Sequence, residues 1–303
     1  SSLFEHFSRL SKPQCDEAVI GLAEIRRQYD YLTARFGPAP AECAFEPGRF
    51  GPIKGEWTRW GNASSGRLVL YFHGGGYVAG SPESNRPLVA RLAQSAEAPV
   101  FSAAYRLAPE HVFPAAVRDG LDLYRHCLDH GINPATIALA GSGSGGGLAL
   151  AVLVAIRNAG LPMPAALVAM SPWADMTLSS WSMLKNAGND ALLSWNMLFV
   201  SARTYLKNNN PADSYASPLF ASFKGFPPLM IHAGSQEILR DDAARIGDKA
   251  AEAGVPVSIE IYDGMPHLFQ ASSYAPEAKV SLQRLGQFIR SRIQTAVMAA
   301  GSP

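Results

Sequence analysis

ALAGSGSGGGLAL, residues 138–150, decides how this chain folds. An apolar run, Ile137–Ala140, enters a glycine-rich turn, and a second apolar run, Leu148–Ile156, leaves it. This pattern predicts a strand, a tight turn and a helix. Gly141, Gly143 and Gly146 match G-x-G-x-x-G, a dinucleotide-binding fingerprint. The same stretch also matches a G-x-S-x-G nucleophile elbow in which Gly143 stands where the serine should be.

Strands are expected to alternate with helices on both sides of this stretch, which predicts a mostly parallel sheet with helices on both faces. A turn at Gly61–Gly66 between the first two strands suits a hairpin. The predicted strands are Gly55–Trp60, Arg67–Phe72, Val100–Tyr105, Thr136–Ala140, Ala166–Met170, Leu229–Ala233 and Val257–Tyr262. Besides the Leu148 helix, the predicted helices are Cys15–Phe36, Pro114–His130, Asp241–Ala253 and a final one through about Ile293.

Composition limits the classes of function. With 303 residues, 48% hydrophobic, the chain can bury a large core. A net charge of +1 lacks the strongly basic character expected of a protein that binds nucleic acid. The sequence has no apolar run long enough to span a membrane and no visible signal-peptide pattern. Three scattered cysteines, at 15, 43 and 127, predict neither a disulfide framework nor a zinc site, so we expect a protein of the reducing cytoplasm.

A second glycine-rich turn, YFHGGGYVAGSP at residues 71–82, follows a predicted strand. Glycine allows backbone N–H groups to approach a ligand without a Cβ in the way. An ester hydrolase needs such donors to hold a tetrahedral oxyanion. The turn is therefore a candidate oxyanion loop, and the alternative is a tight connection without a catalytic role.

The dinucleotide interpretation of residues 141–146 requires an acidic residue at the end of the next strand. That strand ends in Ser171, Pro172 and Trp173, and Asp175 comes too late. The context therefore disfavours a nucleotide cofactor.

Two later residues suit an acid and a base. Glu237 follows the strand Leu229–Ala233, and His267 follows the strand Val257–Tyr262. The order of elbow, acid and histidine is that of α/β-hydrolases. Asp241 and Asp242 stand at the start of a predicted helix, where we expect them to cap it and to match its dipole.

Several motifs together resemble the hormone-sensitive-lipase-like esterases of the α/β-hydrolase fold. They are HGGGY at 73–77, YRLAPEHVFPAA at 105–116, SPWAD at 171–175, ASPL at 216–219, EILRDD at 237–242 and GMPH at 264–267. The resemblance implies an eight-stranded sheet with a helical cap, and hydrolysis of carboxylic esters with short to medium acyl chains, or of lactones. It implies no cofactor and no metal, and it makes a homodimer plausible. The expected division is N-terminal cap helices at 1–45, core at 46–176, a cap insertion at 177–217 and core again at 218–303.

The resemblance carries the catalytic nucleophile onto Gly143, the triad acid and base onto Glu237 and His267, and the oxyanion donors onto the N–H groups of Gly75, Gly76 and Ser144. We expect an apolar substrate pocket that includes Tyr77, Val78, Trp173 and Met176. Two further positions depart from the family pattern, because Ser142 and Ala104 replace acidic residues.

Gly143 has no side chain to attack an ester, and this form should be nearly inactive. Side chains of adjacent residues diverge, so Ser142 and Ser144 should point elsewhere. A water activated by His267 would leave only slow hydrolysis. Two origins of Gly143 stay open: a deliberate inactivating substitution, or a natural hydrolase-like protein that has lost catalysis and binds a small molecule.

Overall fold

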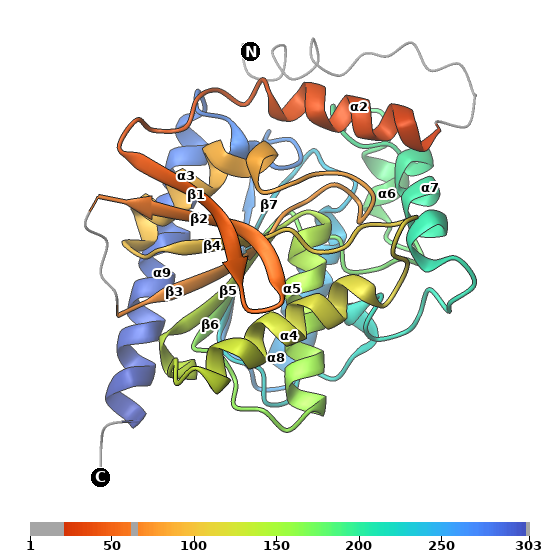
Figure 1. Cartoon of the computed structure of the whole chain (residues 1–303). Helices are drawn as coiled ribbons and strands as arrows, with labels where there is room; N and C mark the ends of the chain where they lie inside the picture. Colours follow the sequence, from red (N-terminus) through yellow and green to blue (C-terminus); the bar gives the residue numbers. More distant parts are fainter. Residues whose placement is uncertain (1–20, 62–65, 301–303) are drawn as a thin grey trace.

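The computed structural model describes residues 21–61 and 66–300, which form one eight-stranded sheet covered by helices (Figure 1). The strand order is β1-β2-β4-β3-β5-β6-β7-β8, and all neighbours from β4 to β8 pair in parallel. The strands are β1 Cys43–Phe50, β2 Ile53–Trp60, β3 Leu68–Phe72, β4 Val100–Ala103, β5 Ile137–Ser142, β6 Ala166–Met170, β7 Leu229–Gly234 and β8 Val257–Tyr262. The predicted α/β fold with an eight-stranded, mostly parallel sheet is confirmed.

Helices pack on both faces of the sheet because its central strands are apolar on both sides. In β3, Leu70 and Phe72 belong to one core with α4 Ala115–Asp129, α5 Ser144–Asn158 and α8 Arg240–Glu252. The alternate residues Val69 and Tyr71 belong to a second core with α3 Arg86–Ala96 and α9 Pro276–Ala300. Successive side chains of a strand point to opposite faces, so one apolar strand supplies two cores.

The predicted hairpin is wrong in its partners. The strand before Gly61–Gly66 pairs with β1 on one side and with β4 on the other, so β4 lies between β2 and β3. The actual hairpin joins β1 to β2 through a two-residue turn at Gly51, where φ is +60°. Sequence patterning missed β1 because Pro47 and Gly48 interrupt it, which an edge strand tolerates.

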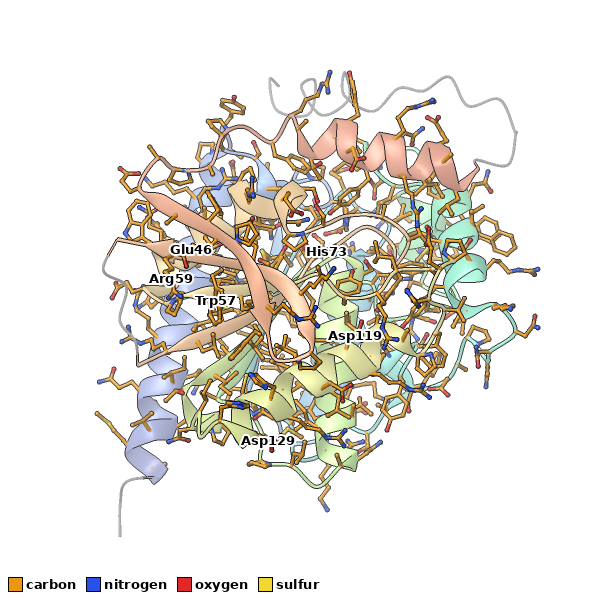
Figure 2. The ribbon with its side chains drawn as sticks, viewed as in Figure 1. Glu46, Trp57, Arg59, His73, Asp119 and Asp129 are labelled. Atoms are coloured by element: carbon orange, nitrogen blue, oxygen red, sulfur yellow. The ribbon has the colours of Figure 1, made fainter. Side chains whose placement is uncertain are left out.

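The hairpin, at the edge of the sheet, carries exposed charged side chains. Glu46 of β1 and Arg59 of β2 form an ion pair across the two strands, and Arg59 lies over the Trp57 ring (Figure 2). Charged side chains on an edge strand oppose pairing with another sheet.

Most predicted elements agree with the structure to within a few residues, with informative exceptions. Helix α5 begins at Ser144, directly after the glycine turn, and α9 extends to Ala300. Helix α3 was not predicted. The predicted helix at Cys15–Phe36 appears as α2 Leu22–Thr33, and the residues before 21 lie outside the described part.

The residues between β6 and β7 contain no strand and include α6 Ser182–Lys185 and α7 Trp195–Leu206. Helix α2 contacts α7 although about 160 residues separate them in the sequence (Figure 1). Within the described ranges, no helix is long and apolar enough to cross a membrane.

Candidate active site

The turn between β5 and α5 holds Gly143 in a conformation that other residues rarely adopt, with φ +53° and ψ −122°. The Gly143 N–H donates to the Met170 carbonyl at 2.9 Å, and its own carbonyl accepts from the N–H groups of Gly146 and Trp173. The turn is also crowded, because a Cβ at Gly145 would lie 2.0 Å from the Phe72 carbonyl oxygen. These contacts fix the direction in which position 143 faces.

His267 and Glu237 form a buried pair at the carboxyl ends of β8 and β7. The His267 Nδ1–H donates to Glu237 Oε2 at 2.6 Å. The other carboxylate oxygen, Oε1, accepts from the Gly234 N–H at 2.6 Å and from the Ser171 hydroxyl at 2.9 Å. Both carboxylate oxygens are therefore bonded, and the imidazole is held with Nε2 as its outward nitrogen.

Position 143 faces that outward nitrogen. A Cβ built on Gly143 would lie 3.5 Å from His267 Nε2, and its next neighbours would be His267 Cε1 at 3.8 Å and Gly74 Cα at 3.9 Å. These are ordinary van der Waals distances. A hydroxyl oxygen on that Cβ could come within about 2.6–3.2 Å of Nε2, the reach of a nucleophile and its base. The structure thus brings Gly143, Glu237 and His267 together.

Sequence reasoning missed Ser171. Its hydroxyl donates to Glu237 and accepts from the Leu268 N–H at 3.1 Å, so it links Glu237 to the segment that carries His267. Ser171 is buried and has a φ of +49°, which is strained for a residue other than glycine. Its position just after β6, at the same edge of the sheet as Glu237 and His267, was the available signal.

The HGGG turn after β3 places backbone groups beside Gly143. Gly75 and Gly76 have φ values of +117° and +64°, and a Cβ at Gly75 would meet the Ala79 carbonyl oxygen at 2.2 Å. Only glycine fits there. No group among the described residues accepts a hydrogen bond from the N–H of Gly75, Gly76 or Ser144. These N–H groups are available to bind a ligand oxygen.

His73, the first residue of this turn, has a structural position (Figure 2). Its ring stacks on Tyr105 with 4.3 Å between centroids, and the Tyr105 hydroxyl donates to the His73 carbonyl at 2.7 Å. Burial lowers the pKa of His73 to about 4, so the ring is neutral at physiological pH.

Neither serine beside Gly143 is seen to contact His267. The Ser142 hydroxyl pairs with the Tyr71 hydroxyl at 2.7 Å. The Ser144 hydroxyl is buried and finds no hydrogen-bond partner in the described part of the chain. Ala104, the other departure from the family pattern, is exposed and uses its N–H to bind the Lys54 carbonyl at 2.9 Å.

A mainly apolar pocket of about 90 Å³ opens at Gly143 and His267. Its apolar wall comes from segments far apart in the sequence and includes Ile25, Leu32, Phe36, Leu192, Met197 and Ala271. Trp173 lies in this wall, as expected. Tyr77, Val78 and Met176 are not among the residues that line this pocket. Tyr77 instead stacks on Tyr205 of α7 in the core, with ring centroids 4.0 Å apart.

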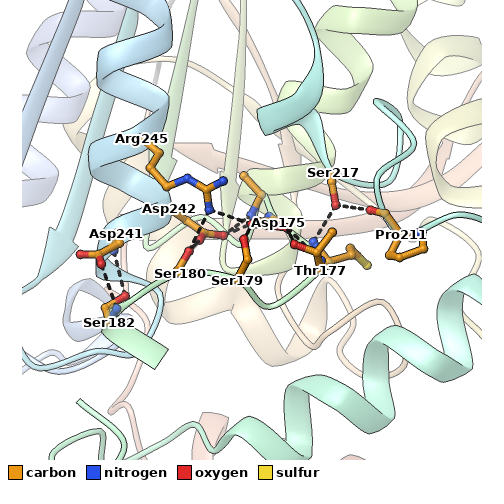
Figure 3. Close-up of polar contacts among 12 residues, drawn as sticks. Asp175, Thr177, Ser179, Ser180, Ser182, Pro211, Ser217, Asp241, Asp242 and Arg245 are labelled. Atoms are coloured by element: carbon orange, nitrogen blue, oxygen red, sulfur yellow. Dashed lines mark hydrogen bonds and ion pairs between the residues drawn. The ribbon is translucent and has the colours of Figure 1, made fainter. Parts of the chain in front are cut away.

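Asp241 and Asp242 lie in the first turn of α8, but they do not cap it. Asp242 is buried and accepts from the N–H groups of Ala174 and Asp175 at 2.8 and 3.0 Å, and from the Ser180 hydroxyl (Figure 3). Burial raises the pKa of Asp242 to about 7. The expected capping role is therefore corrected, because these carboxylates hold the segment that follows Trp173.

Arg245 completes this network. Its guanidinium pairs with Asp175 Oδ2 at 2.7 Å, and Asp241 accepts from the Ser182 N–H at 2.8 Å (Figure 3). The network therefore holds in place the start of the segment that carries α6 and α7.

Comparisons with known proteins agree with this geometry. A family model described as alpha/beta hydrolase fold matches residues 69–271. An acetyl-hydrolase of Streptomyces hygroscopicus is 40% identical over 276 residues, which cover 89% of this chain and 91% of that protein. An esterase of Acinetobacter venetianus is 36% identical over 88% of each chain. The crystal structure of an esterase from the bacterial hormone-sensitive lipase family superposes with a TM-score of 0.90 at 36% identity, and covers 97% of this chain and 99% of that one.

Proposed function

This chain belongs to the hormone-sensitive-lipase-like esterases of the α/β-hydrolase fold, and from that premise we propose that it is an ester hydrolase whose nucleophile position holds Gly143. In this proposal Glu237 and His267 are the acid and base of a Ser-His-Glu triad that lacks its serine. The observation that carries it is the 3.5 Å distance from a Cβ at Gly143 to His267 Nε2, on a histidine whose Nδ1 is bonded to Glu237.

The oxyanion hole consists of the N–H groups of Gly75, Gly76 and Ser144. Their lack of an acceptor within the described ranges supports this role. Preorganised backbone donors stabilise the negative charge that develops on the carbonyl oxygen of an ester under attack. Because they are main-chain groups, the loss of a side chain at 143 leaves them intact.

The substrate is an ester or lactone with a short to medium apolar acyl chain. A small pocket with an apolar wall, in which Trp173 lies, supports this class. In this proposal the described part of residues 1–45, from residue 21 on, and residues 177–217 form a cap over the core segments 46–176 and 218–303, and residues 1–20 lie outside the described part. The contribution of α2 and α7 to the pocket wall supports this division.

Without the serine, His267 Nε2 takes a proton from a water, and the resulting hydroxide attacks the ester carbonyl. The oxyanion then collapses, the bond to the alcohol oxygen breaks, and the imidazolium returns the proton to the leaving alcohol. In a related triad, loss of the serine costs roughly a million-fold in kcat, and the remaining groups retain about 10³–10⁴ over water. The protein as it stands is therefore nearly inactive.

Gly143→Ser tests the proposal. We expect turnover of p-nitrophenyl acetate and butyrate to rise by several orders of magnitude, up to roughly 10⁶, with a burst if deacylation is slow. The control is Gly143→Ala, which adds the same Cβ without an oxygen and should give no gain. Adding His267→Ala to the serine variant should abolish the gain.

A folded Gly143→Ser protein with neither burst nor turnover would overturn the catalytic assignment. If that variant still bound the same esters, the alternative, a small-molecule binding protein on a hydrolase scaffold, would replace it.

A further inference from the structure

A chain of hydrogen bonds leads from the nucleophile elbow to the wall of the pocket. It begins at Ser142, next to Gly143, whose hydroxyl lies 2.7 Å from the Tyr71 hydroxyl. The Tyr71 hydroxyl lies 3.3 Å from Asn85 Oδ1, and Asn85 Nδ2 lies 3.1 Å from the Tyr29 hydroxyl. Tyr29 and Asn85 both line the pocket.

The chemistry of Asn85 gives this chain a direction. Asn85 Nδ2 also lies 3.1 Å from the Ser81 carbonyl oxygen, which can only accept, so the amide must face it with its N–H₂ group. Asn85 Oδ1 is then an acceptor for the Tyr71 O–H. Tyr71, having donated its one proton, accepts from the Ser142 hydroxyl. The hydroxyl protons of Ser142 and Tyr71 therefore both point along the chain toward Asn85.

The chain ends at the Tyr29 hydroxyl, which accepts from Asn85 and still has a proton to donate. No residue in the described part of the chain accepts that proton. The neighbouring Ser84 hydroxyl accepts from the Ser81 N–H and donates its own proton to the Ser81 carbonyl, while the two protons of Asn85 Nδ2 go to the Ser81 carbonyl and the Tyr29 hydroxyl. Burial raises the pKa of Tyr29 to about 12, so the phenol keeps its proton at neutral pH.

Helix α2, which carries Tyr29, is fixed to the oxyanion loop one turn earlier. Arg26 Nε donates to the Val78 carbonyl at 2.7 Å, and Nη2 donates to the Ala108 carbonyl at 3.2 Å. The same guanidinium pairs with Glu110 at 2.8 Å. The Tyr29 donor is therefore held in place relative to Gly75 and Gly76 rather than carried on a loose lid.

We propose that the Tyr29 hydroxyl donates a hydrogen bond to an oxygen of the substrate that lies away from the reacting carbonyl. The preferred ligands are esters with a keto or ether oxygen in an otherwise apolar chain, rather than plain alkyl esters. An apolar wall with one directed donor selects such a group, because a ligand oxygen that enters the pocket loses water and must be paired. This inference rests on the proposed function, since it assumes that esters enter this pocket.

The test uses the protein as it stands, since its low turnover lets ester binding be measured by calorimetry. The ligands are ethyl hexanoate against ethyl 4-oxohexanoate and ethyl 5-oxohexanoate, and pentyl acetate against 2-ethoxyethyl acetate. Tyr29→Phe should weaken at least one oxygen-bearing ester about 3- to 10-fold and change its alkyl counterpart less than about 2-fold. Tyr31→Phe is the matched control, because it removes the same hydroxyl from the exposed side of α2 and should change neither.

Equal weakening of alkyl and oxygen-bearing esters by Tyr29→Phe, or no weakening of either, would overturn the inference and leave the proposed function standing. Failure of every ester to bind the parent protein, together with an inactive Gly143→Ser variant, would overturn the proposed function and the inference with it.

Discussion

Replacing Gly143 should lower the free energy of unfolding. The structure attributes this loss to backbone strain rather than to steric overlap. The backbone there has φ +53° and ψ −122°, and holding a residue other than glycine in such a conformation costs about 1–3 kcal/mol. The nearest atoms to a new Cβ lie 3.5–3.9 Å away, so overlap adds nothing. Gly143→Ala should therefore lower the free energy of unfolding by about 1–3 kcal/mol. The drop for Gly143→Ser should be about 1 kcal/mol smaller than for Gly143→Ala, because the serine hydroxyl can form a hydrogen bond with His267.

Urea unfolding followed by tryptophan fluorescence measures these differences. Two other glycines with open space around a Cβ serve as controls. Gly160 has a φ of +66°, so Gly160→Ala should lower the free energy of unfolding by about 1–2 kcal/mol. Gly188 has no positive φ, so Gly188→Ala should change it by less than about 0.5 kcal/mol. An alanine variant as stable as the parent would refute the strain argument. A serine variant less stable than the alanine variant would refute the predicted contact with His267.

Two further predictions concern the groups around the site. Because the pKa of Asp242 is raised from 3.8 to about 7, the folded protein binds this proton more tightly than the unfolded chain, and stability falls as the pH rises from about 4 to 7. Asp242→Asn should flatten this slope, which is at most about 1.4 kcal/mol per pH unit, in urea titrations at pH 5, 6 and 7, and an unchanged slope would contradict the assignment. In the Gly143→Ser protein, Ser171→Ala removes a hydrogen bond to Glu237 and should lower kcat about 10-fold with little change in KM, whereas a purely structural role would lower only the melting temperature.

Much of the fold could be predicted from local patterns. The strands β5 to β8 and the helices α5 and α8 follow apolar periodicity, which depends only on neighbours in the sequence. The hairpin partners could not be predicted, because the insertion of β4 between β2 and β3 depends on pairing with residues roughly 30 to 50 positions away.

Some residues of the candidate site could likewise be predicted from local patterns, and others depend on how distant segments pack. The order of Gly143, Glu237 and His267 could be identified because each follows a predicted strand. The position of Tyr77 after the glycines predicts a place in the substrate pocket, whereas in the fold its ring packs on Tyr205 of a distant helix. The resemblance places the helix that contains Tyr29 in the cap, but no local pattern indicates that the Tyr29 side chain reaches the pocket.

Residue types and their order along the chain establish the chemical groups of the candidate site: an HGGG turn rich in glycine, an acid and a histidine in hydrolase order, and a nucleophile position without a side chain. Residue type and position along the chain suffice for these statements. Tertiary structure alone decided that Glu237 and His267 meet at 2.6 Å, that Ser171 bonds to both of their segments, and that the Tyr29 hydroxyl ends a chain begun at Ser142. The reason is physical: a hydrogen bond requires its donor and acceptor to lie about 2.7–3.2 Å apart, so a shift of a few tenths of an ångström weakens it. Those distances are set by how distant segments pack, not by the local pattern of either segment.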